Sequence, residues 1–474
     1  MMEPHSLRKL LSLPLGFALF LFFFYPLQAK ETYPEYDEQA VIERLKAIDN
    51  PLVDLQYNSV VKGYIKGYVV WNRDKAARIL GRTVLYFPLF DEYLQENGLP
   101  ENLKYLSVVE SALDPHATSP VGAVGLWQFM PGTGKEYGLE IDDMVDERRD
   151  PHQATQAAMQ HLSHLYNKYD DWALALAAYN GGSGRVSRAI KRSRSKNFWR
   201  LRRYLPRETR NYVPAFIAAT YLMEYYQEHE IVPEYPPLDL QITETIQVYD
   251  YISFYRIAQV TGLNLETIET LNPAYKRGII PESPEGHYLM LPRRVMQAFR
   301  DYLETHRPDE QDDDFFNDSP VVIDQQKASH KDQYIRTTYT VKKGENLQQI
   351  ATALNCSAHQ IIAWNHLPSE EVKEGQKLLI FRPREIARFK PLEKMAELPT
   401  LQAAAALGQA RLSPQSEQGH HFSHLLYIVD RKETLEDISR NVPGLSLPVL
   451  IDLNRIPPNQ KLRPGDCLKV PKNN

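Results

Sequence analysis

A glutamate stands on the apolar face of a predicted helix, where its side chain could do acid chemistry. Residues spaced i, i+3, i+4, i+7 and i+10 share one helical face, and here they are Leu103, Leu106, Ser107, Glu110 and Leu113. A carboxyl among leucines loses solvation, so its pKa rises. A carboxyl that stays protonated near neutral pH can act as a general acid. The helix alone leaves one alternative open, which is a buried glutamate paired with an arginine.

The chain after Glu110 predicts a turn-rich wall beside that carboxyl. Residues 114–125 contain two prolines and two glycines, so we expect the helix to stop soon after Glu110. Glycines let a backbone come close to a ligand. The Trp127 ring that follows offers a flat face for a pyranose, and Gln128 offers a donor and an acceptor for sugar groups. We therefore interpret residues 122–129 as one wall of a carbohydrate cleft.

Several motifs occur in the order and spacing of one enzyme superfamily. The pattern ES-x(7)-S-x-x-GA-x-GLWQ-F-MP-x-T begins at Glu110, and VDER, AAYNGG and ETRNYVP follow at 145–148, 177–182 and 208–214. Together they resemble the lytic transglycosylases of the soluble-lytic-transglycosylase, goose-lysozyme-like superfamily. The VDER and ETRNYVP forms, with the C-terminal repeats, resemble the membrane-bound lytic murein transglycosylase D type.

The C-terminal half carries three copies of one hydrophobic skeleton, which we place at residues 240–295, 337–383 and 425–472. Each copy predicts a strand, two helices and a strand. This order resembles the LysM module, a βααβ fold that binds N-acetylglucosamine polymers. The first copy lacks the usual Gly-Asp/Glu turn, which residues 249–252 replace, so we expect it to pack on the catalytic domain as a structural part. The alternative to glycan binding is that the copies are plain spacer domains. This alternative is least favoured for the second copy.

We therefore predict a multidomain protein with a mainly α, lysozyme-like catalytic domain at residues 96–232. A helical wrap at 30–95, in which we see no chemistry, precedes it, and small α+β (βααβ) LysM-like modules follow. An acidic linker at 305–335 and a polar, alanine-containing linker at 384–424 separate the modules. Such compositions favour mobile tethers. The modules would raise the effective concentration of the enzyme at an insoluble substrate.

Residues 1–29 predict a secretory signal. Arg8 and Lys9 precede an apolar run that ends at Ala29. Leu27 fits the small-residue rule for the cleavage site poorly, so an uncleaved membrane anchor is the alternative. A lipoprotein anchor is excluded because no cysteine lies near residue 29. We expect export to the periplasm or cell envelope, with membrane contact through this segment only.

The overall composition narrows the range of partners. A formal net charge of −5 gives no polycation for nucleic acid, and we expect no nucleic-acid partner. The only cysteines, Cys356 and Cys467, give no zinc signature, and we interpret them as two buried free thiols. A basic run at 185–203 is by default a solvated surface. The more specific hypothesis is that this basic run contacts an anionic cell-wall polymer.

The resemblance implies a reaction that one acid can carry out. Such enzymes cleave the β-1,4 bond between N-acetylmuramic acid and N-acetylglucosamine in peptidoglycan glycan strands, without water. Glu110 would protonate the leaving oxygen and then accept the proton of the 6-hydroxyl, which closes a 1,6-anhydro ring. No metal or cofactor is implied. Motif positions that orient Glu110 or hold sugar in the family fall here on Ser111, Ser119, Gln128, Phe129, Tyr179, Asn180 and Tyr212.

Two other functions compete with this one. A lysozyme-type hydrolase of the same fold would need a second carboxylate across the cleft, and the candidates are Asp142, Asp143, Asp146 and Glu147. We interpret the acidic residues of Asp146-Glu147-Arg148 as structural ion-pair partners instead. A non-catalytic LysM cell-wall scaffold is the third function, and the intact motif around Glu110 argues against it.

Overall fold

The computed structural model describes most of the chain outside the predicted signal and linkers. The described residues are 33–49, 51–305, 323–324, 333–384, 424–429, 434–442, 445–454, 456, 462 and 467–471. The predicted signal or anchor at 1–29 lies outside them, as do most of the two predicted linkers. Within the described ranges, no helix combines the length and the apolar character that crossing a bilayer requires.

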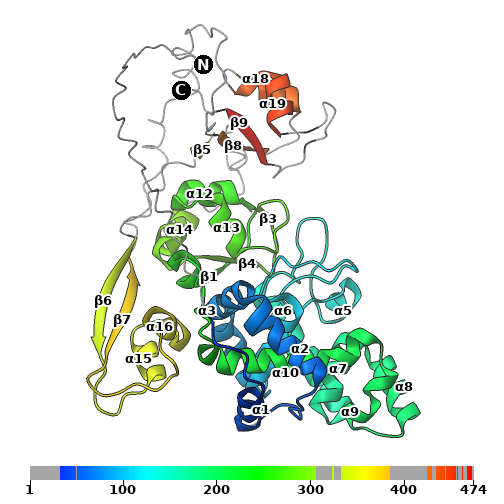
Figure 1. Cartoon of the computed structure of the whole chain (residues 1–474). Coiled ribbons are helices and arrows are strands. Elements are labelled where there is room, and N and C mark those ends of the chain that lie inside the picture. The colour runs from blue at the N-terminus through cyan, green and yellow to red at the C-terminus, as the bar shows by residue number, and fades with distance from the viewer. Residues whose placement is uncertain are drawn as a thin grey trace, which may run out of the picture. The chain divides into compact units, whose positions relative to one another are not determined.

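The first part of the chain is helical, as its apolar spacing predicts (Figure 1). Its elements are α1 (Glu38–Ala47), α2 (Ser59–Lys66), the π-helix η1 (Gly67–Trp71) and α3 (Arg73–Glu96). Asn58 begins α2, because its side chain accepts hydrogen bonds from the backbone N–H groups of Val60 and Val61. The long helix α3 carries Pro88 inside it and still buries Phe90 completely.

The predicted mainly α fold of the next part is confirmed. Its elements are η2 (Glu101–Lys104), α4 (Tyr105–Ser111), α5 (Pro131–Glu136), α6 (Pro151–Tyr169), α7 (Trp172–Gly181), α8 (Ser183–Ser193), α9 (Phe198–Leu201), η3 (Arg202–Tyr204), α10 (Arg207–Tyr225) and η4 (Gln227–His229). Asp150 and Asp171 cap α6 and α7 with their carboxylates. Helix α10 contacts α2, α4 and α7 and so lies at the centre of this part.

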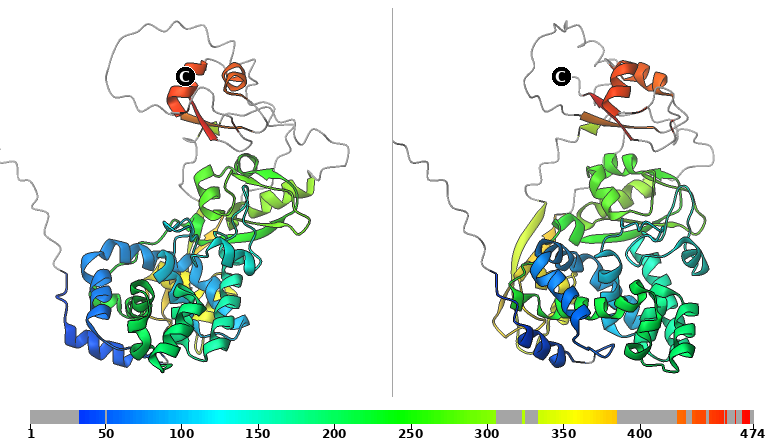
Figure 2. Two further views of the ribbon diagram at one scale, coloured as in Figure 1. Left: turned by 90° about the vertical axis from the view of Figure 1, so that its right-hand side faces the viewer. Right: turned by 45° about the vertical axis from the view of Figure 1, so that its right-hand side comes forward.

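The N-terminal helices and the helices that follow them share one hydrophobic core. Val41, Val61 and Phe90 from the N-terminal helices belong to the same buried cluster as Trp127 and Phe216. The further views in Figure 2 show these N-terminal helices against the helices that follow. The N-terminal helices therefore form part of the body that holds Glu110, and do not make a separate core.

The first repeat adopts the predicted βααβ order. Its elements are α11 (Leu238–Gln241), β1 (Thr243–Val248), β2 (Ile252–Ser253), α12 (Phe254–Thr261), α13 (Leu265–Leu271), β3 (Ile279–Ile280), β4 (His287–Pro292) and α14 (Arg293–Thr305). Strands β1 and β4 pair antiparallel, and β2 pairs with β3. Helix α14 was not predicted, and it buries Val295 and Phe299 in the core of the module. The packed unit thus continues past residue 295.

This first module packs on the helical part that carries Glu110, as expected. Val145 forms a β-bridge with Tyr275 and is buried in the core of the module. The backbone N–H of Asp146 donates to the carbonyl of Ala274 at 2.9 Å, and the backbone N–H of Lys276 donates to the carbonyl of Met144 at 3.0 Å.

The second and third repeats also have the βααβ order. The second consists of β6 (Tyr334–Thr340), α15 (Leu347–Ala353), α16 (Ala358–Asn365) and β7 (Lys377–Pro383). The third consists of β8 (His424–Ile428), α18 (Leu435–Asn441), α19 (Leu447–Asn454) and β9 (Cys467–Pro471), and β5 (Ile323–Asp324) pairs with its first strand. Cys356 is a free, partly buried thiol whose pKa burial raises to about 11, whereas the side chain of Cys467 lies outside the described part.

An asparagine that recurs in the skeleton joins the second helix of a module to its last strand. In the first module Asn272 accepts from the N–H of Met290 at 2.7 Å and donates to its carbonyl at 2.8 Å. In the second, Asn365 makes the same pair of bonds with Leu379, at 2.6 and 2.8 Å. A side chain that both accepts and donates explains why asparagine occupies this position.

Candidate active site

The helix that carries Glu110 stops immediately after it, as the sequence predicts. Helix α4 ends at Ser111, and the next two residues, Ala112 and Leu113, have left-handed φ angles of 56° and 58°. Each costs roughly 1–2 kcal/mol for a residue with a side chain. Arg82 stabilises the turn by donating to the carbonyl of Ala112 at 3.1 Å. The glutamate therefore lies in the last turn of its helix, where the wall segment begins.

Burial is the main influence on Glu110. It raises the pKa of this carboxyl to about 7, the hydrogen bond from Tyr212 lowers the pKa, and the charge of Glu208 raises it. Among the described residues the hydrogen-bond partner of the carboxylate is the Tyr212 hydroxyl, and no arginine is paired with it. The structure therefore does not support the alternative in which Glu110 is a buried glutamate paired with an arginine. A pKa near 7 suits a group that must both give and take a proton.

Two tyrosines from different helices interact electrostatically with this carboxyl. Tyr212, on α10, donates to Oε1 of Glu110. Tyr179, on α7, donates to the carbonyl of Trp127 at 2.8 Å. Burial, and then the charge of Glu110, raises the pKa of both phenols well above 10. Both stay protonated and act as donors.

Asn180 ties the end of α7 to the start of α10. Its Oδ1 accepts from the Thr209 hydroxyl at 2.9 Å, and its Nδ2 donates to Oε1 of Glu208 at 3.4 Å. A Cβ on Gly181 would lie 2.6 Å from Oγ1 of Thr209, so the two helices need glycine there. Glu208 is a site residue that sequence reasoning missed. Its only signal was its place as the first residue of ETRNYVP.

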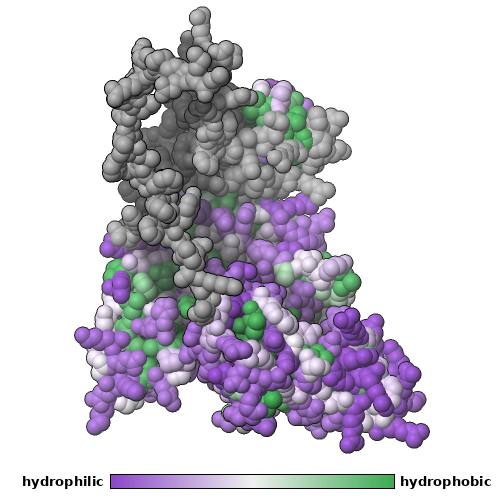
Figure 3. Space-filling model, viewed as in Figure 1, coloured by the Kyte–Doolittle hydropathy of each residue, from purple (hydrophilic) through white to green (hydrophobic). Residues whose placement is uncertain are grey.

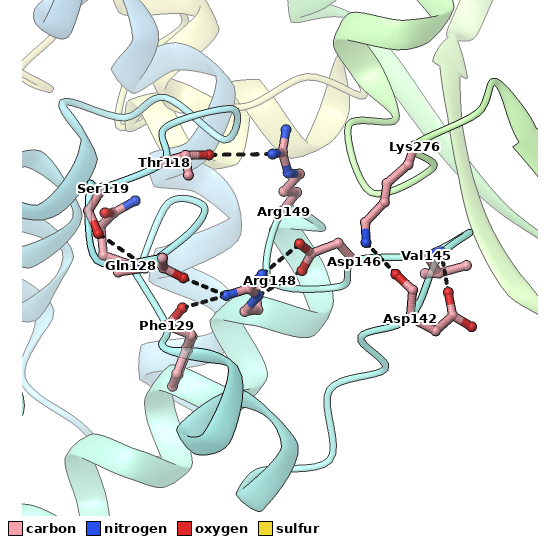
Figure 4. Close-up of polar contacts among 12 residues, drawn as sticks. Thr118, Ser119, Gln128, Phe129, Asp142, Val145, Asp146, Arg148, Arg149 and Lys276 are labelled. Atoms are coloured by element: carbon pink, nitrogen blue, oxygen red, sulfur yellow. Dashed lines mark hydrogen bonds and ion pairs between the residues drawn. The ribbon is translucent and has the colours of Figure 1, made fainter. Parts of the chain in front are cut away.

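The wall segment depends on one glycine and one arginine. Gly125 has φ +86°, and an added Cβ would lie 1.7 Å from the carbonyl oxygen of Arg148. Figure 4 shows Arg148 bound to Asp146 through two 2.8 Å bonds. Its Nη1 also donates to the carbonyls of Gly122 and Phe129, at 2.9 and 3.1 Å. This buried pair holds the wall in shape, as predicted for Asp146.

The wall residues predicted to hold sugar are themselves hydrogen-bonded to the wall. Gln128, at φ 50°, donates from Nε2 to the carbonyls of Ala117 and Gly125 at 3.1 and 2.9 Å. The Ser119 hydroxyl accepts from the N–H of Ala123 at 2.9 Å. Among the described residues no donor to the oxygen of the Gln128 amide is found, so this oxygen can accept from a ligand.

The prediction for Trp127 was wrong. Its ring is 0% exposed, lies against Phe90 at 4.9 Å, and donates from Nε1 to Thr155 at 2.9 Å. It cannot stack on a sugar. Phe129 is also buried, at 3% exposed. Ser111 turns inward, with its hydroxyl 2.9 Å from the carbonyl of Leu126. These side chains support the wall from behind.

A pocket of about 340 Å³ lies beside Glu110. It is lined by four of the predicted site residues, namely Glu110, Ser111, Ser119 and Gln128. Phe129, Tyr179, Asn180 and Tyr212 do not line it. Tyr68, Lys75 and Ile79 also line it. They come from the N-terminal helices, where no chemistry was expected and no local sequence signal marks them.

The basic run lies on α8 and the short helices after it. Figure 3 shows this part of the surface as predominantly hydrophilic. Two of its arginines, Arg192 and Arg203, lie over the Tyr204 ring at 5.3 and 4.9 Å. Part of this charge is therefore held against aromatic rings of the protein itself.

Comparison with known families divides the chain into matched segments. Residues 88–201 match the transglycosylase SLT domain. Residues 242–308 match the LysM-like domain of the lytic transglycosylase MltD. Residues 339–381 and 427–471 match the LysM domain.

Similar proteins carry related names. The membrane-bound lytic murein transglycosylase D of Escherichia coli K12 is 31% identical over 293 residues, which is 60% of this chain and 61% of that protein. The soluble lytic murein transglycosylase of the same strain is 29% identical over 31% of this chain and 22% of its own length. The X-ray structure of the lytic transglycosylase Slt from Pseudomonas aeruginosa is 29% identical, covers 31% of this chain and 24% of that one, and has a TM-score of 0.26. The chain thus contains a transglycosylase SLT domain, an MltD-type LysM-like domain and two LysM domains.

Proposed function

We propose that this protein is an exported peptidoglycan lytic transglycosylase. It cleaves the MurNAc-β-1,4-GlcNAc bond and leaves a 1,6-anhydroMurNAc end. The observation that carries the proposal is Glu110, a carboxyl of the SLT domain whose pKa burial raises to about 7 and to which a buried tyrosine hydroxyl donates a hydrogen bond. The chemical form of the released sugar end tests it.

In the proposed mechanism Glu110 first gives a proton and then takes one. Its protonated form donates to the glycosidic oxygen as the bond from the anomeric carbon breaks, and the substrate N-acetyl group assists at that carbon. The resulting carboxylate accepts the proton of the 6-hydroxyl, whose oxygen bonds to the same anomeric carbon. The nucleophile belongs to the substrate and is already oriented. Tyr212 stabilises the carboxylate between the two transfers.

The predicted substrate-binding set remains a proposal, and its members differ in position. Ser119 and Gln128 line the pocket and are proposed to contact sugar. Asn180 is proposed to hold Glu208 and a sugar group. The remaining members are proposed to position Glu110 and the wall, and they are Ser111, Phe129, Tyr179 and Tyr212.

A lysozyme-type hydrolase is the second candidate, and Glu208 is the observation that favours it. Two of the four carboxylates proposed from sequence are paired with arginines, since Asp143 faces Arg277 at 4.0 Å and Asp146 binds Arg148. Glu208 is instead the carboxylate whose charge reaches Glu110. The names of the similar proteins support the lyase, and product analysis distinguishes the two reactions.

The remaining segments are proposed to bring the enzyme to its substrate. We propose that residues 1–29 direct export and that the LysM modules bind glycan strands in the periplasm or cell envelope. Sedimentation with insoluble peptidoglycan tests this part independently of cleavage. We expect binding to persist when catalysis is removed.

The pH profile provides a test of the Glu110 assignment. An acid must be protonated to act, so kcat/KM is expected to fall as pH rises through about 7. Glu208→Gln removes a negative charge that raises the pKa of Glu110, so this falling limb should move to lower pH. Measuring kcat/KM against pH in both proteins checks the shift. Glu43→Gln, on the exposed face of α1, is the control, and a limb that stays in place in Glu208→Gln would reject the coupling.

A further inference from the structure

A second group of ionisable side chains lies where the SLT domain meets the first LysM-like module. Glu140, Glu147 and His287 each offer one ligand atom, and these atoms all lie within 4.8 Å of one another. The two glutamates come from the loop between α5 and α6, and the histidine begins β4. The proposed reaction at Glu110 uses none of them.

The backbone fixes the positions of these residues. The N–H of Glu147 donates to the carbonyl of Glu140 at 2.9 Å, and the N–H of Glu140 donates to Oε2 of Glu147 at 2.7 Å. The bridge between Val145 and Tyr275 then joins this loop to the module. The donors therefore come from two domains but lie on one connected hydrogen-bonded frame.

His287 is a buried side chain without a polar partner. It is 6% exposed, and its ring meets the edge of Tyr275 at 5.9 Å and 82°. Within the described part of the chain, no hydrogen bond to its imidazole is found. One of its ring nitrogens instead lies within 4.8 Å of a carboxylate oxygen of Glu140 and of Glu147. A buried imidazole normally finds a partner, and the group it faces here is a pair of carboxylates.

The charge around this group is negative. Burial raises the pKa of the Glu147 carboxyl, and the nearby charges of Asp150 and Glu140 act in the same direction. No described lysine or arginine forms an ion pair with either glutamate of the group. Lys276 lies nearby and donates to the carbonyl of Asp142. Glu147 thus lies outside the ion pair of Asp146 with Arg148, contrary to the prediction, and its surroundings lack a paired cation.

The donor set selects among cations. Zinc accepts imidazole nitrogen together with carboxylate oxygen and takes four ligands, whereas calcium and magnesium take oxygen ligands. Two carboxylates and one imidazole leave the fourth position for water. The ligand atoms must approach to about 3.4 Å of one another around zinc. The exposed Glu140 side chain has the freedom to make this adjustment.

We propose that Glu140, Glu147 and His287 form a zinc site that fastens the first LysM-like module to the SLT domain. The ion joins a loop that also carries Asp146, the partner of Arg148, to the first residue of β4. Its role is structural, and it takes no part in the glycan chemistry.

Zinc binding by the full chain, freed of metal with a chelator, tests the site. In competition with a chromophoric chelator we expect one Zn²⁺ per chain, and we expect Glu140→Gln and His287→Gln each to weaken binding tenfold or more. Glu140 is exposed, so its variant should fold even where loss of the buried imidazole perturbs β4. His164→Gln, on the exposed face of α6, is the matched control and should bind as the wild type does. No binding by the wild type, or unchanged binding in both variants, overturns the proposal.

Hydrogen exchange supplies a readout that separates this site from a surface ion. Zn²⁺ should slow exchange of the seam amides of Asp146 and Lys276, whose bonds join the two domains. The same amount of Ca²⁺ or Mg²⁺ should not. Protection in the wild type that is absent in Glu140→Gln supports the proposal. Equal protection in both proteins, or none in either, contradicts it.

Discussion

Replacing Glu110 with glutamine is expected to abolish cleavage of glycan strands, with a loss of about a thousandfold or more. Glutamine keeps the size of the side chain but cannot protonate the leaving oxygen or accept the proton of the 6-hydroxyl. Both proposed steps therefore fail together. The measurement is the rate of release of soluble products from purified peptidoglycan.

The same variant shows whether the loss is chemical or structural. The folded pKa of Glu110 is raised, so its ionisation destabilises the fold as pH rises through about 7. Glu110→Gln should therefore melt at or above the wild-type temperature at pH 8, and the difference should shrink by pH 5. It should also sediment with peptidoglycan as the wild type does. Near-wild-type lysis by a folded Glu110→Gln protein would contradict the assignment of Glu110 as the catalytic acid and base.

Tyr212→Phe is expected to reduce kcat by about 10- to 100-fold. The substitution keeps the ring in the core and removes the hydroxyl that donates to Glu110. Without this donor the carboxylate formed after the first proton transfer is less stable. Because the hydrogen bond lowers the pKa of Glu110, its loss should move the falling limb of the pH profile to higher pH. This shift is opposite to that expected for Glu208→Gln.

A matched control for this change lies on the same helix. Tyr225 is also on α10, and its hydroxyl donates to the carbonyl of Arg44 at 3.0 Å, away from Glu110. Tyr225→Phe should leave kcat and the pH profile unchanged. If Tyr212→Phe behaves like Tyr225→Phe in both measurements, the hydrogen bond to Glu110 has no role in the reaction.

Local patterns predicted much of this fold because they act over a few residues. The leucine spacing placed Glu110 on a buried helical face, and the proline- and glycine-rich segment after it ended the helix at Ser111. The repeated skeleton predicted the βααβ order of all three modules. A structural ion pair was also predicted for Asp146, and the structure shows that its partner is Arg148.

The features that were missed depend on contacts between distant parts of the chain. Trp127 looked like a sugar platform, but its ring fills the core against Phe90, which lies on α3. Tyr68 and Lys75 reach the pocket only because the N-terminal helices share that core. Glu208, on α10, comes near Glu110 because α10 packs against α4. The spacing of residues along the sequence does not predict these tertiary contacts.

The chemical form of the released muramic acid tests the central claim most directly. Wild-type protein is incubated with purified peptidoglycan in water enriched in ¹⁸O, and the products are analysed by mass spectrometry. If Glu110 is the only acid and base and the 6-hydroxyl is the nucleophile, the new ends are 1,6-anhydroMurNAc and contain no ¹⁸O. New reducing ends that carry ¹⁸O would show that water is the nucleophile, and would contradict the lytic transglycosylase mechanism.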